Sequence, residues 1–326
     1  MRRPGLGHIA VLVAAVLALA LAGCGGGGGG GGAGGGASGG GGGGNQPIAK
    51  NPQNASKSIT VGSKNFPEQL VLGNIYAQAL EAAGFKVESQ LNLGSEVIAF
   101  KALRNGDVDA YPEYTGTVLT TLYKVPAKDV PKEPQQAFTE AKDRLRRDKI
   151  TGMPVTPFEN TYRLGATKQT ADRLRVRTTS ELAPKAKDLT ITGYPECRQR
   201  QDCYVGVQKT YGMKFKDFVA SEQTYEVLDQ DEAQVGFLFT TDAQLSTGKY
   251  RTFEDDKKFF PPYNVSFLVR DEAVRRLGPE AQQVVERVQR PLTERVMIEL
   301  NSRVVLDKEK PEDVARQYLR AEGFVK

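Results

Sequence analysis

The sequence is most informative in what it lacks. It contains no tryptophan, only three cysteines and a single histidine, His8, which lies in a segment that we expect to be removed. A mature chain without histidine has no Ser-His-Asp or Cys-His machinery, no HExxH zinc site and no imidazole general base. Three cysteines are too few for a zinc ribbon or an iron–sulfur centre. The sequence therefore predicts no metal site and no cofactor, and an enzyme could act only through carboxylates, lysine or tyrosine.

The first 23 residues have the parts of a secretory signal. Two arginines, Arg2 and Arg3, precede an apolar run of about 14 residues over 9–22, which is short for a membrane span. Residues 21–24 read Leu-Ala-Gly-Cys and resemble a bacterial lipobox, in which Cys24 would carry the lipid. We therefore expect a signal peptide over 1–23 and an extracytoplasmic, lipid-anchored protein. An uncleaved anchor helix is the alternative, and it places the rest of the chain on the same side of the membrane.

A glycine-rich stretch follows the cysteine. Residues 25–44 hold 17 of the 35 glycines of the chain, and such a composition behaves as a flexible coil. With the polar stretch that follows it, we expect a flexible tether over 24–58. The formal net charge of +5 includes Arg2 and Arg3. Without them it is too small and too dispersed to favour a nucleic-acid partner.

Residues 59–326 read as alternating strands and helices. A strand over 59–62 leads into a helix that opens at Asn65 to Glu68, with Asn65 as a capping residue and Pro67 in the first turn. A strand over 86–93, a helix over 96–105 and a strand over 108–111 complete a βαβαβ unit with a parallel sheet. We expect a helix after Pro134, strands at 162–166, 189–191 and 235–239, and long helical patterns over 271–301 and 311–321. This pattern predicts an α/β fold with two lobes and a cleft, in which ligand groups gather at strand ends.

Several side chains stand at such strand ends. Lys64 lies between a strand and a helix N-terminus, a position that suits an anion, although a surface lysine near a turn is the simpler interpretation. Tyr111 and Tyr114 end another strand and could equally be core residues. Tyr162 and the aromatic run 259–263 lie near expected hinge positions. Taken singly, each of these residues is more often packing than ligand binding.

The two remaining cysteines are six residues apart. Outside the cytoplasm a disulfide between Cys197 and Cys203 is the expected state. The bridge would hold Arg198 and Arg200 on a tight loop, where either arginine could enter a cleft or remain in solvent.

Together these segments resemble a known family, the substrate-binding proteins of ABC importers for quaternary-ammonium osmoprotectants such as glycine betaine, choline and carnitine. The strongest matching blocks are residues 61–70 (VGSKNFPEQL), 72–78 (LGNIYAQ), 101–109 (KALRNGDVD) and 111–117 (YPEYTGT). Weaker ones are 160–162 (NTY), 239–242 (FTTD) and 259–263 (FFPPY). The resemblance covers residues 59–326 and is looser over 170–235.

The resemblance implies a type II periplasmic-binding-protein-like fold with two hinge crossovers. Lobe 1 would comprise 59–160 and 265–326, and lobe 2 would comprise 161–264. It also implies an aromatic box for the trimethylammonium group and a clamp for a carboxylate. The implied box residues are Tyr114, Tyr162, Phe239 and Tyr263. The implied clamp residues are Lys64, Thr117 and Arg200, with Arg198 as the alternative to Arg200. Family members commonly carry tyrosine where this chain has Phe239, so the ring face is kept and the hydroxyl is lost.

We therefore expect a monomeric binding protein that is not an enzyme. Its partners would be a small quaternary amine, an ABC permease with its ATPase, and the membrane through the lipid anchor. One rival is a sensory module of the same fold. The other is an enzyme that uses carboxylates such as Asp107 or Asp109. Which quaternary amine is the substrate stays open, because a carboxylate clamp favours betaine or carnitine while choline binders use the same box.

Overall fold

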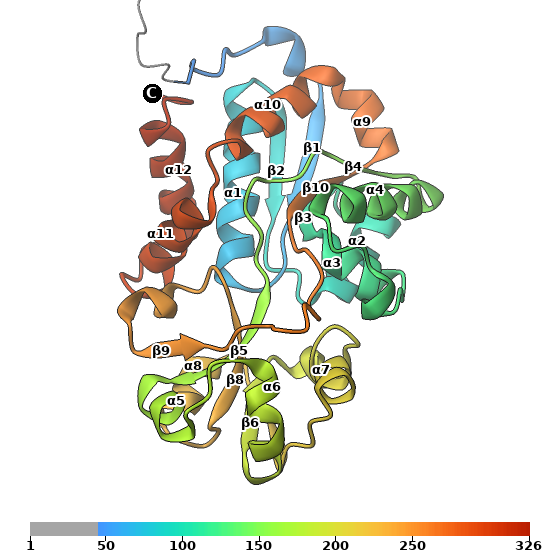
Figure 1. Ribbon diagram of the computed structural model, residues 1–326. Helices are drawn as coiled ribbons and strands as arrows, with labels where there is room; N and C mark the ends of the chain where they lie inside the picture. Colours follow the sequence, from blue (N-terminus) through green and yellow to red (C-terminus); the bar gives the residue numbers. More distant parts are fainter. Residues whose placement is uncertain (1–44) are drawn as a thin grey trace, which may run out of the picture. The chain divides into compact units, whose positions relative to one another are not determined.

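A computed structural model describes residues 45–326 of the chain. The expected signal peptide, the lipidated Cys24 and the stretch 25–44 lie outside the described residues. Within 45–326, ten strands form two five-stranded sheets with the orders β2-β1-β3-β10-β4 and β7-β6-β8-β5-β9. We call each sheet with the helices packed on it the first and the second lobe, respectively (Figure 1). The expected α/β class is confirmed.

The first lobe is built on the predicted βαβαβ unit. Its strands are β1 (Ser58–Gly62), β2 (Lys86–Gln90), β3 (Ala110–Tyr114), β4 (Ile150–Gly152) and β10 (Val265–Arg270). Its helices are α1 (Pro67–Ala82), α2 (Glu96–Asn105), α3 (Thr115–Thr117), α4 (Pro134–Leu145), α9 (Asp271–Leu277), α10 (Pro279–Gln289), α11 (Glu294–Val305) and α12 (Pro311–Ala321). Strand β1 is parallel to β2 and β3, as predicted, whereas β10 returns antiparallel to β3 and β4. Helices α10, α11 and α12 pack against α1, and α2 contacts β3 and β10 (Figure 1).

One local expectation about helices is wrong. Asn65 does not cap α1, because the N-cap position is Phe66, without a side-chain cap, and the Asn65 amide instead donates to Glu222 of the second lobe at 3.2 Å. The helical patterns expected over 271–301 are confirmed and form three helices, α9, α10 and α11. Gly278 separates α9 from α10 with a φ of 79°, a left-handed backbone that favours glycine. Thr293 starts α11 by accepting a hydrogen bond from the backbone of Val296.

The second lobe repeats the mixed pattern on a smaller scale. Its strands are β5 (Tyr162–Thr167), β6 (Thr190–Gly193), β7 (Asp217–Ala220), β8 (Val235–Phe239) and β9 (Tyr250–Thr252). Its helices are α5 (Lys168–Leu174), α6 (Thr179–Leu182), α7 (Tyr204–Tyr211) and α8 (Thr224–Asp229). Strands β6, β7 and β8 are mutually parallel, and β5 is antiparallel to β8 and β9.

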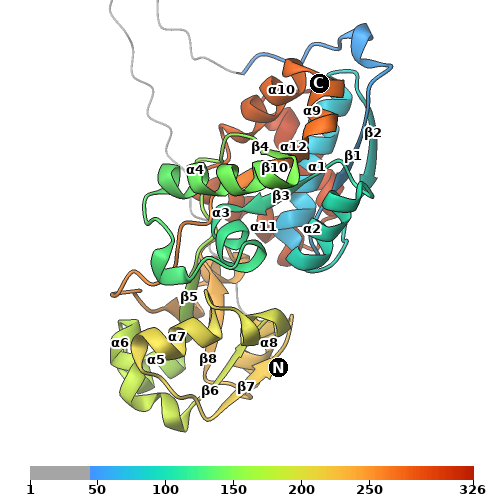
Figure 2. The same cartoon turned by 90° about the vertical axis from the view of Figure 1, so that its right-hand side faces the viewer.

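The chain passes between the two sheets twice. The first passage lies between β4 and β5 and the second between β9 and β10. The two segments run side by side, because Glu159 and Asn264 form an antiparallel bridge. The Asn264 side chain also donates to the carbonyl of Phe158 at 3.0 Å. The two lobes are therefore joined by a paired connection (Figure 2).

Residues before β1 pack on the first lobe. The backbone N–H of Ile48 donates to the carbonyl of Phe324 at 2.8 Å, and the buried Asn54 side chain donates to the carbonyl of Ala83 at 3.0 Å. A short 3₁₀ helix spans Pro52–Asn54. The sequence places this stretch in a flexible tether over 24–58, but in the structure residues 48–57 belong to the folded unit.

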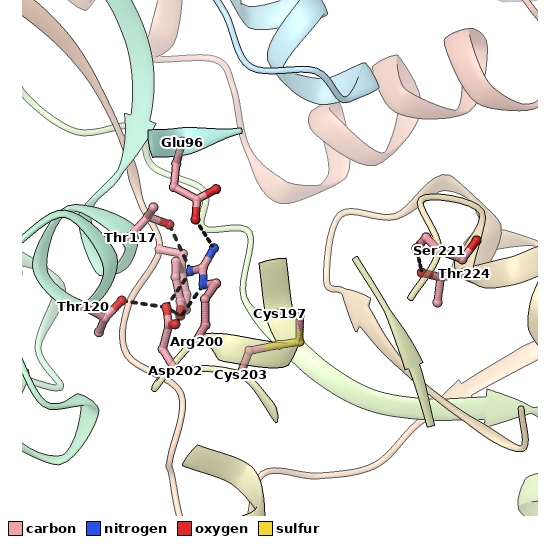
Figure 3. The surroundings of a disulfide bond; sticks show 10 residues. Glu96, Thr117, Thr120, Cys197, Arg200, Asp202, Cys203, Ser221 and Thr224 are labelled. Carbon is pink, nitrogen blue, oxygen red and sulfur yellow. Dashed lines mark hydrogen bonds and ion pairs between the residues drawn. A yellow bond between two sulfur atoms is a disulfide. The ribbon is translucent and has the colours of Figure 1, made fainter. Parts of the chain in front are cut away.

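The expected disulfide is present. Cys197 and Cys203 are bonded to each other, and both are fully buried. The loop between them precedes α7 and lies at the edge of the second lobe that faces α2 and α3 of the first (Figure 3).

Breaking this disulfide is expected to destabilise the protein. In the chain-entropy description, a closed loop of this length lowers the free energy of the folded state relative to the unfolded one by about 2.4 kcal/mol. Urea unfolding of Cys197→Ser/Cys203→Ser should show a loss of this order. A reductant should lower the stability of the wild-type protein and leave that of the double variant unchanged; equal stabilities of the two proteins would contradict the prediction.

Candidate functional site

The cavity between the lobes lies where strands end. Strands β1 and β3 of the first lobe, and β6 and β8 of the second, point their carboxyl ends toward it. The lining residues are Lys64, Phe66, Glu96, Tyr114, Thr117, Asn160, Tyr162, Tyr194, Glu196, Arg200, Phe239 and Tyr263. All seven ligand-binding residues expected from the sequence are in this set.

The four rings expected to form the box lie close together. Tyr162 and Phe239 are 4.5 Å apart between ring centroids and tilted by 34°, and Tyr162 and Tyr263 are 5.7 Å apart and nearly perpendicular. Tyr114 contributes from the first lobe, at the end of β3. Strand pairing places them, because Tyr162 lies opposite Phe239 in the β5–β8 pair and Tyr114 lies opposite Val265, two residues after Tyr263. The antiparallel strands β5 and β10 thus begin beside the ends of β8 and β3, respectively.

Two further rings, which were not predicted from the sequence, also line the cavity. The ring centroid of Phe66 lies 6.2 Å from that of Tyr114 and 6.4 Å from that of Phe239, and its ring is within 19° of parallel to both. Tyr194 lies 6.1 Å from Phe239. Both follow the carboxyl end of a parallel strand, β1 and β6 respectively. That rule, applied to every strand, would have identified them.

Arg200 reaches the cavity from the disulfide loop, and Arg198 does not. The Arg200 guanidinium donates to both carboxylate oxygens of Asp202, at 2.9 Å and 2.6 Å. It also approaches Thr117 and Glu96 of the first lobe, each at 3.5 Å (Figure 3). Arg198 instead lies 5.9 Å from the ring centroid of Phe218. The structure thus places Arg200, rather than Arg198, at the boundary between the lobes.

The partner of Arg200 is itself buried. Asp202 is fully buried and accepts hydrogen bonds from the hydroxyls of Thr120 and Tyr263, each at 2.6 Å. Burial is the largest single influence and would raise the pKa of Asp202, but the charge of Arg200 and the hydrogen bonds from Arg200, Thr120 and Tyr263 together outweigh it and hold the pKa below its usual value. Because Thr120 and Arg200 come from different lobes, Asp202 links the disulfide loop to the first lobe (Figure 3).

Lys64 is the second cation at the cavity. Its ammonium group pairs with Glu113, and both side chains are buried. The same ammonium nitrogen lies 4.5 Å from the ring centroid of Tyr114 and 5.5 Å from that of Phe66. The positive charge of Lys64 is therefore partly neutralised before any ligand arrives.

Polar residues that the sequence reasoning missed complete the lining. They are Glu96, Asn160 and Glu196. Glu96 is the first residue of α2, and Glu196 belongs to the disulfide loop region, where burial raises the pKa of its carboxyl. Asn160 lies in the matching block 160–162 but was not assigned to the site, and no motif singles out Glu96 or Glu196, since an acid in the first turn of a helix is common on ordinary surfaces.

The carboxylates considered for an enzyme lie elsewhere. Asp107 is exposed and does not line the cavity. Asp109 pairs with Arg276 at 2.8 Å and accepts a hydrogen bond from the backbone of Thr60 at 3.0 Å. It therefore serves the first lobe as a structural link. Among residues 45–326 there is also no cluster of three or more His, Cys, Asp or Glu side chains that could hold a metal.

Comparison with known proteins decides the family. Residues 57–321 match the family described as the substrate binding domain of ABC-type glycine betaine transport system, OpuAC. The chain belongs to this family. It is accordingly a substrate-binding protein of an ABC transport system and not an enzyme.

The sequence is also similar to individual proteins that are named as transport binding proteins. The chain is 28% identical over 273 residues to the carnitine transport binding protein OpuCC of Listeria monocytogenes, covering 82% of this chain and 87% of that one. It is also 28% identical over 279 residues to the ergothioneine transport permease/ergothioneine binding protein EgtU of Helicobacter pylori, covering 84% of this chain. The match spans only 49% of that longer protein.

Solved structures of the same fold support the assignment. A glycine betaine/carnitine/choline ABC transporter structure matches with a TM-score of 0.65 and 26% identity, covering 81% of this chain and 98% of that one. Lactococcal OpuAC, solved in its closed form with glycine betaine, matches with a TM-score of 0.58 at 15% identity, covering 82% and 96%. The expected two-lobed type II binding-protein fold is confirmed.

Asp242 lies next to Phe239, one of the rings that line the cavity. Its carboxylate accepts hydrogen bonds from the backbone N–H of Phe239 at 2.8 Å and the hydroxyl of Tyr225 at 2.7 Å. Burial of the carboxyl outweighs these bonds and raises its pKa to about 7. The group thus holds a proton in the folded state over a range where the unfolded chain has lost it.

The stability contribution of Asp242 is expected to fall as the pH rises. The folded state binds one more proton than the unfolded state from about pH 4 to about pH 7, so the free energy of unfolding decreases across this window. Asp242→Asn removes the titration. Urea unfolding at pH 5 and pH 8 should show the variant gaining stability relative to wild type at the higher pH. If the difference in unfolding free energy between the two proteins were the same at both pH values, the raised pKa of Asp242 would be contradicted.

Proposed function

We propose that the protein is an extracytoplasmic, lipid-anchored binding protein that captures a quaternary-ammonium solute and delivers it to an ABC permease with its ATPase. One observation carries the proposal. Aromatic rings from both lobes line a single cavity. Phe66 and Tyr114 belong to the first lobe, Tyr162 and Phe239 to the second, and Tyr263 to the connection between β9 and β10. The family membership and the names of the relatives point to the same class of solute.

The chemistry of the box suits a permanently methylated nitrogen. A quaternary ammonium has no N–H to donate, so hydrogen-bond acceptors alone give it little. Aromatic faces offer negative electrostatic potential and apolar contact together, each worth about 0.5–2 kcal/mol for a cation. Four rings could offset the cost of closing two lobes around the ligand and leave micromolar affinity, about −8 kcal/mol. Phe239 supplies a ring face without a hydroxyl, which is all that this role requires.

The other end of the cavity suits a polar group. Arg200, Thr117 and Lys64 are the candidates to hold a carboxylate such as that of betaine or carnitine. Arg200 and Lys64 are already paired with Asp202 and Glu113, so each would offer its remaining donors rather than a free charge. This arrangement admits choline as well, because its hydroxyl can interact with the same groups.

Closure of the lobes would report binding to the permease. We place the lobe boundaries at 59–160 with 265–326, and at 161–264, and the hinge at the paired segments between them. The contacts of Arg200 with Glu96 and Thr117 cross from one lobe to the other, so they would form only when the cavity is closed. A ligand that touches both lobes shifts the equilibrium toward this state.

The remaining parts of the proposal concern the chain's location. Within 45–326 no helix has the length and apolar character needed to cross a membrane. We propose that Cys24 carries the lipid, that the glycine-rich stretch gives the binding domain reach toward the permease, and that the domain acts as a monomer.

A thermal-shift screen tests the function directly. Residues 45–326 would be heated with glycine betaine, carnitine, choline, ergothioneine or amino acids, each in excess. A cognate ligand at one hundred times its dissociation constant adds about 2.7 kcal/mol to the folded state. Stabilisation by amino acids and by none of the quaternary amines would overturn the proposal. Uptake by cells that express the matching permease would then separate transport from a sensory role.

Tyr114→Ala should weaken the binding of the stabilising quaternary amine by about 1 kcal/mol or more, the order of one lost cation–π contact. Calorimetric titration gives the affinity. Tyr211→Ala is the matched control, since Tyr211 is a buried tyrosine of the second lobe outside the cavity. The control should lower stability and leave affinity unchanged. An unaltered affinity for Tyr114→Ala would remove this ring from the box.

A further inference from the structure

A buried carboxylate, Glu68, lies behind the first-lobe side of the cavity. It is the second residue of α1 and is 3% exposed. One oxygen accepts the hydroxyl of Tyr114 at 2.7 Å and the amide of Asn160 at 2.9 Å. The other accepts the hydroxyl of Thr241 at 2.6 Å and the amide of Asn301 at 2.9 Å. Four neutral donors, all directed at the two oxygens, are what an ionised carboxylate requires.

Glu68 differs from the other carboxylates that hold buried tyrosines near the cavity. Asp202, which accepts the hydroxyl of Tyr263, is paired with Arg200. Glu113, which accepts the hydroxyl of Tyr111, is paired with Lys64. In the described part of the chain, Glu68 has no lysine or arginine within ion-pair distance. Its charge is stabilised only by neutral donors and by the N-terminus of α1.

A buried negative charge without a cation is costly unless something compensates it. Tyr114, whose hydroxyl donates to Glu68, also lines the cavity. Glu68 also borders a neighbouring space that shares Phe66, Asn160, Tyr194 and Phe239 with the cavity. A ligand cation in the box would therefore lie near this charge in a region of low polarity, where Coulomb attraction is stronger than in water.

We propose that Glu68 is a specificity-determining residue, the countercharge that makes the cavity prefer a permanently cationic headgroup over a neutral one of the same shape. This inference rests on the proposed function and deepens it. Glu68 acts in two ways through Tyr114. Its charge attracts the cation through the ring, and the hydrogen bond that it accepts polarises the phenol and makes the ring face more negative. Glu68 does not touch the ligand.

The test compares a cation with its neutral isostere. The ligands are choline and 3,3-dimethylbutan-1-ol, in which carbon replaces the charged nitrogen. Calorimetry measures choline, and ligand-observed NMR measures the weaker alcohol. Glu68→Gln keeps the shape of the side chain and removes the charge. It should weaken choline binding about tenfold, the order expected for losing one poorly screened charge at this range, and leave binding of the alcohol unchanged.

Glu81→Gln is the matched control, because it removes the same charge from an exposed position on the same helix. It should change choline affinity less than about twofold, since exposed charges are screened by solvent. Tyr114→Phe is the second variant, in case Glu68→Gln folds poorly. It keeps the ring and removes the hydroxyl that links the ring to Glu68, and it should weaken choline binding severalfold without affecting the alcohol.

The outcomes separate the inference from the function on which it rests. If Glu68→Gln lowered the affinities for choline and for the alcohol equally, Glu68 would only stabilise the positions of the rings, and the inference would be overturned. Unchanged choline affinity in both Glu68→Gln and Tyr114→Phe would overturn it too. If the wild-type protein bound neither choline nor any other quaternary amine, the proposed function itself would fail, and the inference with it.

Discussion

The cavity exists because parallel strands of two sheets end opposite each other and antiparallel strands begin at the same place. The pairing of Tyr162 with Phe239, and of Tyr114 with Val265, fixes this meeting point. A slip of one residue in either pair would turn the rings to the other face of the sheet. The paired connection between the lobes, with its bridge from Glu159 to Asn264, lies immediately beside these rings. The strand register, the paired connection and the aromatic lining of the cavity are thus consequences of one arrangement of strands.

Charge around the cavity follows a second constraint, because buried ions need partners. Arg200 pairs with Asp202 and Lys64 pairs with Glu113, so the two cations nearest the ligand are largely neutralised within the protein. They keep donors available while adding little net positive charge, which would repel a quaternary amine. Among residues 45–326, Glu68 has no such cationic partner, in contrast to Asp202 and Glu113. The proposed preference for a cationic ligand rests on this unpaired negative charge rather than on Arg200 or Lys64, the two cations expected from the sequence.

The loop closed by the disulfide contacts the other lobe. Cys197 and Cys203 lie in the second lobe, yet Arg200 and Asp202 between them contact Glu96, Thr117 and Thr120 of the first (Figure 3). A free loop of this length would lose much of that contact energy to the entropy of ordering its side chains. The bridge restricts the loop before closure, so that the contacts across the cleft can be formed at lower entropic cost.

The sequence by itself determined the α/β class, the βαβαβ start of the first lobe, the disulfide pairing and, through the family resemblance, seven residues that the structure gathers at one cavity. These features depend on local periodicity, on strand-end positions and on motifs, all of which are written along the chain. Tertiary structure alone decided the rest. It brought Phe66, Tyr194, Glu96 and Glu196 to the cavity, chose Arg200 over Arg198, drew residues 48–57 into the fold and surrounded Glu68 with donors from four separate segments. Such outcomes depend on which distant segments meet, and no local pattern in the sequence encodes a contact between residues 68 and 301.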